Sequence, residues 1–473
     1  MKYRQLGKTN IKASILGFGA MRLPLIDENP EHVDIKQTEE MFEYAIEHGV
    51  NMFDTALVYH TTDRKKPGVS ETILGDILGS GFGDKLHIST KMPSWEIKSW
   101  EYFDKTLDLQ LERLNVDQIE LFFVHSIKDS FYDDIKQAGV YEFVDRALDD
   151  GRIKHACFST HGSYELLCQI LDDYDRWDCA LTQLNYLDVD ENPGIRGVEK
   201  LHDLNIGTMI MEPLRGGKLA ENQPQSVKNI FKKNEKDIKP IRWAFNYLWD
   251  KEEVDCVLSG MSNICQVKEN IALVDDAEVG MLSDEEKAIL HEVKDEYDNL
   301  NAINCTSCNY CMPCKFGVNI PKCFREYNMD LLGDDSIDSV QYRFHMHEDR
   351  QAHNCVGCNE CVSVCPQHIN IPEQLKVVKN HFGAWIHMTR EIVVIDVVPR
   401  ILTLENTVVE LFNIINKTSD KEVILDFKGV EFMNVAFAQK YNELKRECKK
   451  NISEINLGEY ASLMSVAINL FEY

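Results

Sequence analysis

Two stretches of this chain, "KLHISTKM" at residues 85–92 and "QIELFFVHS" at residues 118–126, decide its fold. Each is a short run rich in β-forming residues, and a helical stretch separates them. This alternation is typical of βα units, in which helices connect parallel strands and cover the sheet. We therefore expect an α/β fold built on a parallel sheet.

The same alternation extends from residue 13 to about residue 275, with helical stretches such as "TEEMFEYAIEHG" (38–49) and "IRWAFNYLWD" (241–250) between the runs. The other β-rich runs are "SILGFGA" (14–20), "GVNMFDTA" (49–56), "HACFSTHG" (155–162), "CALTQLNY" (179–186), "IGTMIMEPL" (206–214) and "DCVLSGM" (255–261). Eight βα units predict a (β/α)₈ TIM barrel. A doubly wound open sheet would carry a G-x-G-x-x-G turn after its first strand, and "LGFGAMRLP" (16–24) lacks that turn.

Composition and charge limit the class of protein and its partners. The 473 residues are 44% hydrophobic and 27% charged, which predicts a globular protein of two or three domains. A net charge of −27 leaves no basic field for nucleic acid or an anionic membrane. No stretch approaches eighteen consecutive apolar residues, and the N-terminal sequence shows no apolar run with a cleavage site. We expect a soluble cytoplasmic protein.

Four polar residues stand where consecutive β-rich runs stop. The second run stops at Asp54, with Tyr59 five residues later, the third stops at Lys91 and the fourth at His125. In TIM-barrel enzymes the active site forms at the C-terminal ends of the strands, so these side chains should meet at one mouth. Any one of them alone is more often a solvated or structural residue. Four of them on consecutive strands favour catalysis.

These groups suit carbonyl reduction, in which hydride adds to carbon and the oxygen receives a proton. A phenol, with a pKa of about 10, is a weak acid at neutral pH, but a neighbouring cation lowers that pKa. We predict Tyr59 as the general acid and Lys91 as its cation. Asp54 would hold Lys91 in place, and His125 would hydrogen-bond the carbonyl oxygen as charge develops there.

Over nearly all of its first 275 residues the chain resembles the aldo-keto reductase family. The likeness lies in "YRQLGKTNIKASILGFGAMRLP" (3–24), "NMFDTALVYH" (51–60), "VSETILGDIL" (69–78), "STKM" (89–92), "FFVHS" (122–126), "TQLNYL" (182–187), "MEPLRGGKL" (211–219) and "SGMSNICQVKEN" (259–270). The resemblance implies the same tetrad, with Tyr59 as the acid, and a nicotinamide cofactor across the barrel mouth. The contacts it implies are Ser159 and Gln183 for the nicotinamide, Pro213, Leu214 and Gly216 for the diphosphate, and Gly260, Ser262, Gln266, Glu269 and Asn270 for the adenosine end.

Two departures from the family pattern concern the cofactor. Thr160 and His161 follow Ser159, where the family usually has Asn, so that carboxamide contact is an open question. Members that prefer NADP often place Lys and Arg at the positions of Gly260 and Gln266, which weakens the case for NADP. Both NADP and NAD stay open as the cofactor. In "VSETILGDIL", Glu71 is predicted to cap its helix rather than to act in the chemistry.

Cysteine is concentrated in one part of the chain. Of fifteen cysteines, nine lie between Cys305 and Cys365, and a reducing cytosol favours metal ligands or buried thiols over disulfides. The other six are isolated and are predicted to be plain core residues: Cys157, Cys168, Cys179, Cys256, Cys265 and Cys448.

Eight of the nine form two runs of ligand-like spacing. Cys305, Cys308, Cys311 and Cys314 follow C-x₂-C-x₂-C-x₂-C, and Cys355, Cys358, Cys361 and Cys365 follow C-x₂-C-x₂-C-x₃-C with Pro366 next. The second spacing is that of a bacterial ferredoxin. Zinc commonly takes C-x₂-C pairs, which leaves the third and fourth cysteines of each run unexplained. The spacing favours two [4Fe–4S] clusters over zinc, disulfides or unmetallated thiols.

In two-cluster ferredoxins the fourth cysteine of each run ligates the other cluster. The resemblance implies one cluster on Cys305, Cys308, Cys311 and Cys365 and another on Cys355, Cys358, Cys361 and Cys314. Because the first run has x₂ before its last cysteine, Cys323 is an alternative ligand, although a core role is favoured. The wide gap between the runs resembles the helical ferredoxin-type extension of one branch of the aldo-keto reductases, with helices expected in 324–333 and 339–350.

The last part of the chain changes character again. Residues 389–473 contain three β-then-α units, and "KEVILDFKGVEFMNVAFAQKYNELKRE" (421–447) resembles a STAS-like domain. Asn434, Val435 and Ala436 stand where phosphorylated members carry Ser or Thr, so docking or dimerisation is favoured over a phospho-switch, with a plain α/β cap as the alternative. We predict a barrel over 1–285, a ferredoxin-type iron–sulfur domain over 286–384 and a small α/β STAS-like domain over 385–473.

Together these patterns predict a nicotinamide-dependent oxidoreductase that interconverts a small-molecule carbonyl and alcohol and carries two clusters. Clusters pass single electrons whereas nicotinamide delivers two, and splitting the pair usually needs a flavin or a metal centre. No flavin site is evident, so a flavin from a partner, a redox protein partner and clusters with a structural role all stay open, as does a homo-oligomer. The rival hypothesis is a redox-sensing regulator that binds nicotinamide and signals through the clusters and the STAS-like domain.

Overall fold

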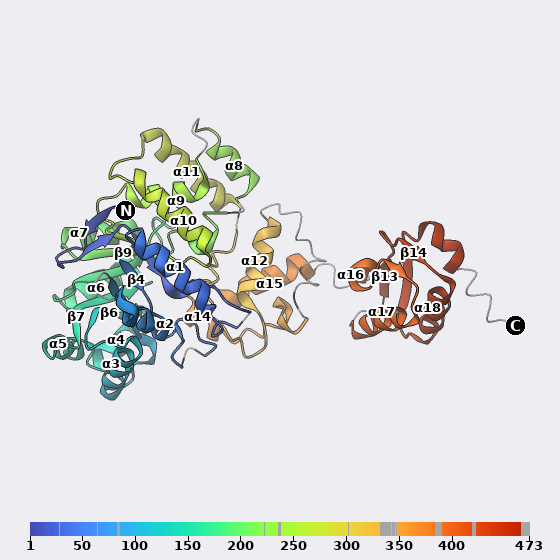
Figure 1. The fold of residues 1–473 in the computed structure, drawn as a ribbon, viewed down its shortest axis with the longest axis horizontal. Helices are drawn as coiled ribbons and strands as arrows, with labels where there is room; N and C mark the ends of the chain where they lie inside the picture. The colour runs from blue at the N-terminus through green and yellow to red at the C-terminus, as the bar shows by residue number, and fades with distance from the viewer. Residues whose placement is uncertain are drawn as a thin grey trace. The chain divides into compact units, whose positions relative to one another are not determined.

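The computed structural model of the chain contains a closed barrel of eight parallel strands (Figure 1). The structure describes residues 1–27, 29–63, 65–82, 86–221, 223–234, 238–300, 302–331, 342, 346, 348–383, 390–418 and 422–464. In these residues no helix is long and apolar enough to cross a membrane.

The eight predicted β-rich runs are the eight barrel strands, so the predicted TIM barrel is confirmed. In chain order the strands are β3 (Leu16–Gly19), β4 (Met52–Asp54), β5 (His87–Pro93), β6 (Ile119–Ile127), β7 (Ile153–Thr160), β8 (Cys179–Gln183), β9 (Gly207–Met211) and β10 (Cys256–Ser259), and β10 pairs with β3 to close the barrel. The helices between and after them are α1 (Ile35–Glu47), α2 (Ser70–Ile77), α3 (Trp100–Leu114), α4 (Tyr132–Gln137), α5 (Val140–Asp149), α6 (Tyr164–Asp173), α7 (Gly194–Asp203), α8 (Gln225–Phe231), α9 (Pro240–Trp249), α10 (Ile264–Leu273) and α11 (Asp284–Asn299).

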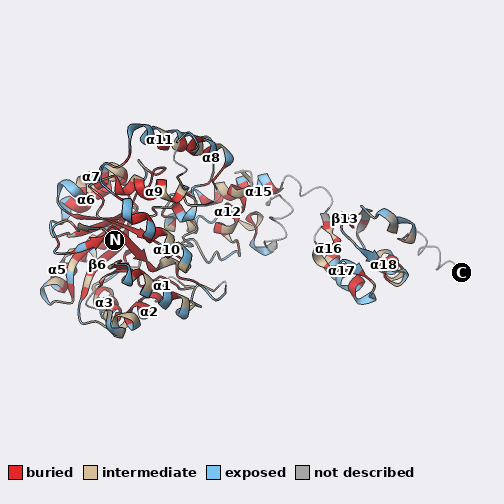
Figure 2. Ribbon diagram, turned by 45° about the horizontal axis from the view of Figure 1, so that its top comes forward, coloured by how far each residue is buried: buried red, intermediate tan, exposed pale blue. Residues whose placement is uncertain are grey.

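Two layers of apolar side chains hold the barrel together. One layer lies between the strands and the outer helices, and it includes Phe18, Phe42 and Phe53. The other fills the barrel interior, where Leu121 and Phe123 of β6 meet Met52 and Leu181. Figure 2 shows the buried residues concentrated on the strands and on the inner sides of the helices.

A hairpin that the sequence did not predict covers the N-terminal end of the barrel. It consists of β1 (Tyr3–Gln5) and β2 (Lys12–Ser14), and Leu6 in its turn belongs to the interior cluster. Gly7 adopts a φ of +46°, and a Cβ there would lie 2.2 Å from the backbone nitrogen of Gly207. Only glycine permits this close approach of the turn to the start of β9.

The isolated cysteines divide into two groups. Cys157, Cys179 and Cys256 are fully buried in the barrel interior, as predicted. Cys265, however, is exposed, so for it the prediction of a core role is wrong, whereas Cys168 and Cys448 are half-buried and Cys448 packs against an apolar core of the C-terminal residues. They lie on or beside surface helices, where one helix face meets solvent.

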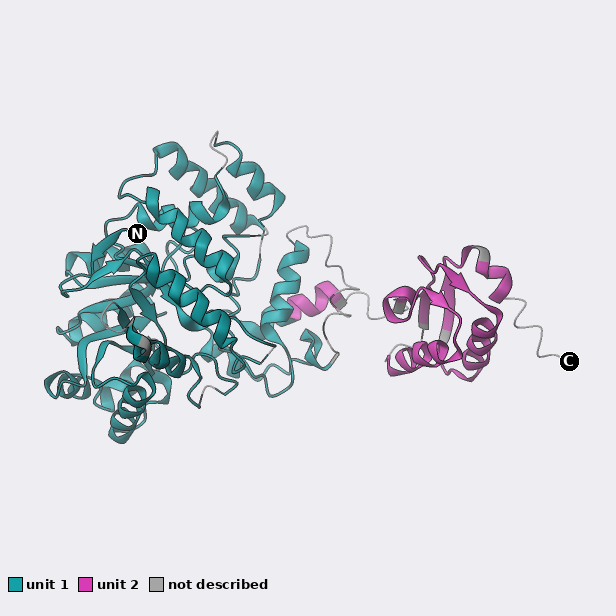
Figure 3. Cartoon of the chain, viewed as in Figure 1, with its two compact units in different colours: residues 1–336, 349–375 teal, residues 337–348, 376–473 magenta. Residues whose placement is uncertain are grey.

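The two cysteine runs belong to the same compact unit as the barrel. That unit comprises residues 1–336 and 349–375, and a second unit comprises residues 337–348 and 376–473 (Figure 3). The cysteine runs are accompanied by helices α12 (Ile320–Leu331), α14 (Glu360–Val364) and α15 (Ile371–Gly383). The helix expected over 339–350 falls mostly outside the described residues, as does the predicted boundary between residues 384 and 385.

The second unit contains a small α/β fold with its own apolar core. Parallel strands β11 (Arg390–Val393), β13 (Glu422–Asp426) and β15 (Asn451–Ile455) form one sheet, and β12 (Ile401–Leu402) pairs with β14 (Phe432–Met433). The helices are α16 (Val394–Val397), α17 (Glu405–Lys417) and α18 (Val435–Glu447). In the β-rich stretch "EIVVIDVV" (391–398) the strand ends at Val393 and the chain continues as α16. The STAS-like resemblance of this segment stays a prediction.

Candidate active site and cysteine loops

The centre of the site is a buried ammonium group at the end of β5. Lys91 Nζ donates to Asp54 Oδ2 at 2.5 Å, to the Thr55 carbonyl oxygen at 2.7 Å and to the Tyr59 hydroxyl oxygen at 3.0 Å. All three donor positions of the ammonium are therefore occupied. Ser89 Oγ donates to the other carboxylate oxygen of Asp54 at 2.6 Å, which fixes that carboxylate in turn.

Strand register explains why these residues meet. In the parallel pairing of β4 with β5, Asp54 lies opposite Ser89, and in that of β5 with β6, Pro93 lies opposite His125. Side chains two residues apart on a strand point to the same side, so Ser89 and Lys91 both face the barrel axis. The structure thus brings Asp54, Lys91, Tyr59 and His125 together at one mouth.

Burial sets the protonation behaviour of this group. It lowers the pKa of Lys91 below 10.5, although the carboxylate of Asp54 acts in the opposite direction. Burial, followed by the charge of Asp54, raises the pKa of Tyr59 well above 10.0. The predicted lowering of the Tyr59 pKa is therefore wrong, because the loss of solvent favours the neutral phenol. Free Tyr59 therefore carries its proton at neutral pH.

His125 stands within an aromatic group. Its ring centroid lies 6.1 Å from that of Tyr59 and 5.2 Å from that of Trp95. Its Nε2 lies 3.3 Å from the hydroxyl oxygen of Tyr310, a residue of the first cysteine loop. The imidazole is only 4% exposed, yet it lines the cavity described next.

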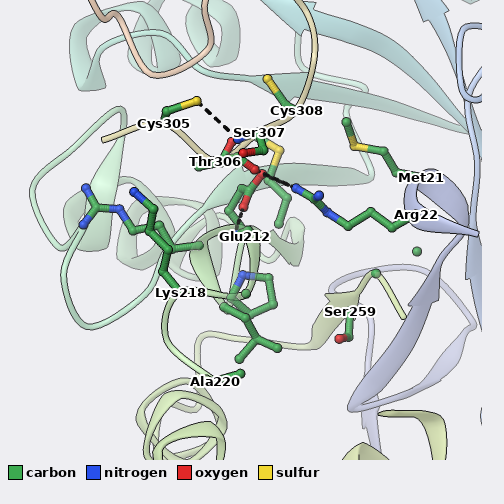
Figure 4. Close-up of a pocket in the computed structure, with 18 of the residues that line it drawn as sticks. Met21, Arg22, Glu212, Lys218, Ala220, Ser259, Cys305, Thr306, Ser307 and Cys308 are labelled. Atoms are coloured by element: carbon green, nitrogen blue, oxygen red, sulfur yellow. Dashed lines mark hydrogen bonds and ion pairs between the residues drawn. The ribbon is translucent and has the colours of Figure 1, made fainter. Parts of the chain in front are cut away.

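One cavity of about 1060 Å³ joins the four residues to the rest of the barrel mouth. Figure 4 shows a part of its lining that includes Arg22, Glu212 and Lys218. All four of the mouth residues line it, together with nine of the ten residues predicted to contact the cofactor. Those lining residues are Ser159, Pro213, Leu214, Gly216, Gly260, Ser262, Gln266, Glu269 and Asn270. The volume is in the range of sites that enclose large ligands.

Gln183 is the predicted contact that does not line this cavity. Its Nε2 donates to Asp188 Oδ2 at 2.8 Å and to Gln367 Oε1 at 3.2 Å, and Gln367 Nε2 donates back to Gln183 Oε1 at 2.8 Å. Gln367 follows the last cysteine of the second run by two residues. The side-chain amide of Gln367, which belongs to the cysteine module, is therefore paired with that of Gln183.

Two of the predicted cofactor contacts, Ser159 and Asn270, form hydrogen bonds with neighbouring residues. The Ser159 hydroxyl accepts from the Ser126 backbone N–H at 2.7 Å, and Asn270 Nδ2 donates to Ser259 Oγ at 3.0 Å. Thr160, at the family's Asn position, donates from its hydroxyl to the Ile127 carbonyl oxygen at 2.9 Å, which holds it in the strand pairing. These side chains are fixed in place before any ligand binds.

Cationic side chains line the part of the cavity next to Pro213 and Gly216. They include Arg22, Arg215 and Lys218, and such charges suit the diphosphate of a dinucleotide. At the adenosine end Lys239 is paired with Glu269 at 2.7 Å. The cavity and its donor set therefore fit the nicotinamide dinucleotide that the resemblance implies.

The two cysteine loops share a backbone conformation. Ser307 and Asn309 in the first loop have φ values of +55° and +62°, and Gly357 and Asn359, at the same offsets in the second, have φ values of +74° and +62°. Left-handed residues between ligands turn successive backbone N–H groups inward. The Ser307 N–H donates to Cys305 Sγ at 3.4 Å, the kind of bond that a cluster thiolate accepts.

The thiols gather in the two sets that the ferredoxin pattern implies. A small cavity of about 20 Å³ is lined by Cys305, Cys308, Cys311 and Cys365 and closed by apolar residues such as Phe324. Burial raises the pKa of Cys308 to about 12, and the charges of Cys305 and Cys365 add to this effect. The donor set thus fits an iron–sulfur cluster, which binds thiolates in a largely apolar setting.

The second set of thiols is more exposed to solvent than the first. Burial raises the pKa of Cys361 to about 11, and the charges of Cys355, Cys358 and Cys314 raise it further, which places these four thiols near one another. Among the described residues, no three Cys, His, Asp or Glu side chains lie close enough to share a single metal ion. A cubane holds each thiolate on a different iron, so its ligands stand farther apart than those of one ion. Cys323 is buried outside both sets, with Sγ 3.7 Å from the Arg350 carbonyl oxygen.

Several polar contacts fasten the cysteine module to the barrel mouth. Lys128 Nζ donates to the Cys365 carbonyl oxygen at 3.0 Å, and Lys218 Nζ donates to the Ile303 carbonyl oxygen at 3.0 Å. Arg22 donates to the Thr306 carbonyl oxygen at 2.8 Å, beside the half-buried carboxylate of Glu212 (Figure 4). Cys305 and Cys308 consequently line the same cavity as Tyr59.

Glu71 has a role other than the predicted helix cap. Its buried carboxylate accepts from Thr90 Oγ1 at 2.7 Å, from Gln110 Nε2 at 2.8 Å and from Arg113 Nε at 3.0 Å. These bonds connect α2 and α3 to β5, one residue before Lys91. The capping prediction is wrong because the carboxylate finds stronger donors in the protein interior.

The residues that sequence reasoning missed come mainly from the cysteine module. Tyr310, Thr306 and Gln367 reach the barrel mouth, and only their nearness to predicted cluster ligands could have suggested them. Arg22 and Lys218 lie in the motifs that carry the family resemblance. Their cationic heads could have been assigned to the cofactor cavity on that basis.

Comparison with known proteins agrees with this geometry. The model of the "Aldo/keto reductase family" matches residues 15–295, more than half of the chain. The chain belongs to the aldo/keto reductase family. A model described as "4Fe-4S dicluster domain" matches residues 304–369, so this aldo-keto reductase carries a 4Fe–4S ferredoxin-type domain after its barrel.

The relatives of this aldo-keto reductase include sugar oxidoreductases. L-galactose dehydrogenase of Arabidopsis thaliana is 27% identical over 319 residues, which are 62% of this chain and 96% of the relative. 6-dehydroglucose reductase of Novosphingobium aromaticivorans is 26% identical over 231 residues, which are 47% of this chain and 71% of the relative. An aldo-keto reductase structure from Bacillus halodurans shares the fold, with a TM-score of 0.52, 22% identity and coverage of 62% of this chain and 96% of that one.

Proposed function

We propose that this protein is a nicotinamide-dependent oxidoreductase that interconverts a small-molecule carbonyl and its alcohol, with Tyr59 as the general acid. The observation that carries the proposal is the contact of Lys91 Nζ with the Tyr59 hydroxyl at 3.0 Å and with Asp54 at 2.5 Å, inside the large cavity. NAD or NADP would lie in that cavity against Ser159, Gly216 and Asn270. When bound, the nicotinamide supplies or accepts the hydride.

Side chains of the protein bind the substrate's carbonyl oxygen and supply its proton. The substrate oxygen accepts hydrogen bonds from Tyr59 and His125, which hold it against the buried end of the cavity. As hydride adds to the carbonyl carbon, Tyr59 gives its proton to the oxygen, and Lys91 stabilises the phenolate that remains. The reverse sequence oxidises the alcohol. Asp54 keeps the ammonium charged and in place throughout.

The cysteine module would hold two [4Fe–4S] clusters, one on Cys305, Cys308, Cys311 and Cys365 and the other on Cys355, Cys358, Cys361 and Cys314. The shared left-handed residues of the two loops and the four-thiol cavity support this assignment. Two relatives that act on sugars make a polyol or sugar carbonyl a reasonable first substrate to test. No observation favours the alternative of a redox-sensing regulator.

The variant Tyr59→Phe tests the proposal. Loss of the proton donor should lower kcat for carbonyl reduction by roughly 100- to 10,000-fold. The dissociation constant for NADH or NADPH, measured by fluorescence quenching, should stay unchanged because the cavity keeps its shape. Tyr44→Phe, on the outer helix α1, is the control and should keep full turnover. Full turnover of Tyr59→Phe would contradict the assignment of the acid.

A further inference from the structure

The first cysteine loop places a side chain inside the barrel's active site. Tyr310 lies between Cys308 and Cys311 in the sequence, both predicted ligands of one cluster. Its side chain lines the cavity that contains Tyr59 and Lys91, and its hydroxyl lies 3.3 Å from Nε2 of His125. The two residues in contact are 185 positions apart in the chain.

Neighbouring residues contact both the backbone and the ring of Tyr310. Its backbone N–H bonds to the thiol of Cys308, so the main chain is tied to the cluster set. Its ring lies 6.2 Å from that of Trp95, and Trp95 in turn lies 5.2 Å from His125. The rings of His125 and Tyr310 line the cavity, and Trp95 packs beside both of them.

The contact is made with the nitrogen that the proposed chemistry uses. In the proposed function His125 donates a hydrogen bond to the substrate oxygen, which fits the tautomer that carries its proton on Nε2. The Tyr310 hydroxyl oxygen can accept from that N–H until the substrate oxygen takes its place. The Tyr310 hydroxyl lies within hydrogen-bond distance of that nitrogen. It also takes up room beside it, so the space left for the substrate's substituents on this side is bounded by the cysteine loop.

We propose that Tyr310, delivered by the cluster-bearing loop, is a positioning and specificity-determining residue of the active site, whose hydroxyl oxygen favours the His125 tautomer with its proton on Nε2 and orients that N–H within the cavity. This inference rests on the proposed function for its catalytic meaning. The contact itself stands on the geometry alone. The cysteine module is then a wall of the catalytic cavity as well as a holder of clusters.

Two variants and a matched control test this role on the full-length, cluster-loaded protein. Tyr310→Phe removes only the hydroxyl, Tyr310→Ala removes the ring, and Tyr327→Phe is the control. Tyr327 is a tyrosine of the same module, on α12, that lines neither cavity. Iron content and the dissociation constant for nicotinamide should match the wild type in all three, which checks that the module is intact.

The kinetic readout uses 4-nitrobenzaldehyde and a bulkier aromatic ketone as probes. Tyr310→Phe should lower kcat about five- to tenfold with little change in KM, as expected for the loss of one hydrogen bond to a positioned group. Tyr310→Ala should favour the bulkier ketone, raising its kcat/KM relative to that of the aldehyde. Tyr327→Phe should change neither quantity.

A second readout does not depend on turnover. Diethylpyrocarbonate modifies accessible imidazole nitrogens, and peptide mass analysis reports the modification of His125 separately from other histidines. Removal of the Tyr310 hydroxyl should raise that rate several-fold, whereas Tyr327→Phe should leave it unchanged. Equal kinetics and equal His125 modification in Tyr310→Phe and Tyr327→Phe would overturn the proposal. A higher modification rate in Tyr310→Phe, with no carbonyl turnover by the wild type, would support the contact and overturn the proposed function instead.

Discussion

Lys91 shows how a single residue sets the working pH of the site. The ammonium is 1% exposed and keeps its charge because Asp54, at 2.5 Å, offsets part of the cost of burial. Its pKa is nevertheless lowered from 10.5, with burial as the main cause. Tyr59, by contrast, has its pKa raised, so the lysine is the group of this pair that loses its proton first as the pH rises.

This order predicts the alkaline limb of the pH profile. For carbonyl reduction, kcat/KM should stay level near neutral pH and fall as the pH rises through the lowered pKa of Lys91, with a midpoint below 10.5. The reason is that neutral Lys91 no longer stabilises the phenolate of Tyr59. Initial rates from pH 6 to 11 measure this limb. A midpoint above 10.5 would show that the tyrosine itself titrates there.

Asp54→Asn is the matched variant for this profile. Without the carboxylate, the main charge that offsets the burial of Lys91 is lost, so the pKa of Lys91 should fall further and the alkaline limb should move to lower pH. Asn keeps the shape of the side chain and can still accept from Ser89. An unchanged midpoint would show that Asp54 does not govern the charge of Lys91.

Helix α2 shows how an element outside the mouth supports the site. Its Glu71 bonds to Thr90 of β5 and to Gln110 and Arg113 of α3, so α2 and α3 brace the strand that ends in Lys91. The two helices approach closely at Gly75. A Cβ there would lie 2.5 Å from the Arg113 carbonyl oxygen, a backbone atom that has no room to move without shifting α3.

Gly75→Ala should therefore destabilise the barrel, and Gly79→Ala is its control. At Gly79 the nearest atom to an added Cβ is 4.0 Å away, so alanine fits without a clash. We expect Gly75→Ala to lower the free energy of unfolding by about 1–3 kcal/mol, as overpacked sites do. Thermal and urea unfolding of the two variants measure the difference. Equal stability of the two variants would mean that α2 and α3 can move apart without a loss of folding free energy.

At the scale of the whole molecule, the barrel and the cysteine module form one unit with a shared cavity. Thiols of the first set and the proposed acid Tyr59 line the same space. Clusters pass single electrons, whereas a nicotinamide passes a hydride. Because Cys305 and Cys308 line the cavity, a cluster on these thiols would lie close to a bound nicotinamide, and electron exchange between the two can be tested.

Iron analysis and spectroscopy of anaerobically purified protein answer it. The wild type should hold about eight irons per chain, as two [4Fe–4S] clusters require. Cys365→Ser should lose about four of them, whereas Cys323→Ala should keep all eight, because Cys323 lies outside both thiol sets. Full iron in Cys365→Ser would contradict the assigned ligand set. Reduction of the clusters by NADH or NADPH, followed by EPR, would place them on the electron path.

Much of the architecture could be predicted from the sequence because it depends on local patterns. Eight β-rich runs make eight strands, and the C-terminal ends of parallel barrel strands always meet at one mouth. Asp54, Lys91 and His125 could be chosen for that reason alone. Cluster ligands follow the same logic, since C-x₂-C spacing brings thiols together within one loop.

The tertiary structure decided what depends on contacts between distant parts of the chain. Only the docking of the cysteine module shows that Tyr310 meets His125 and that Gln367 pairs with Gln183. Only packing shows that burial raises the pKa of Tyr59. Local spacing determines which residues an element offers. Desolvation and contact arise when elements far apart in the sequence enclose them, and no single segment carries that information.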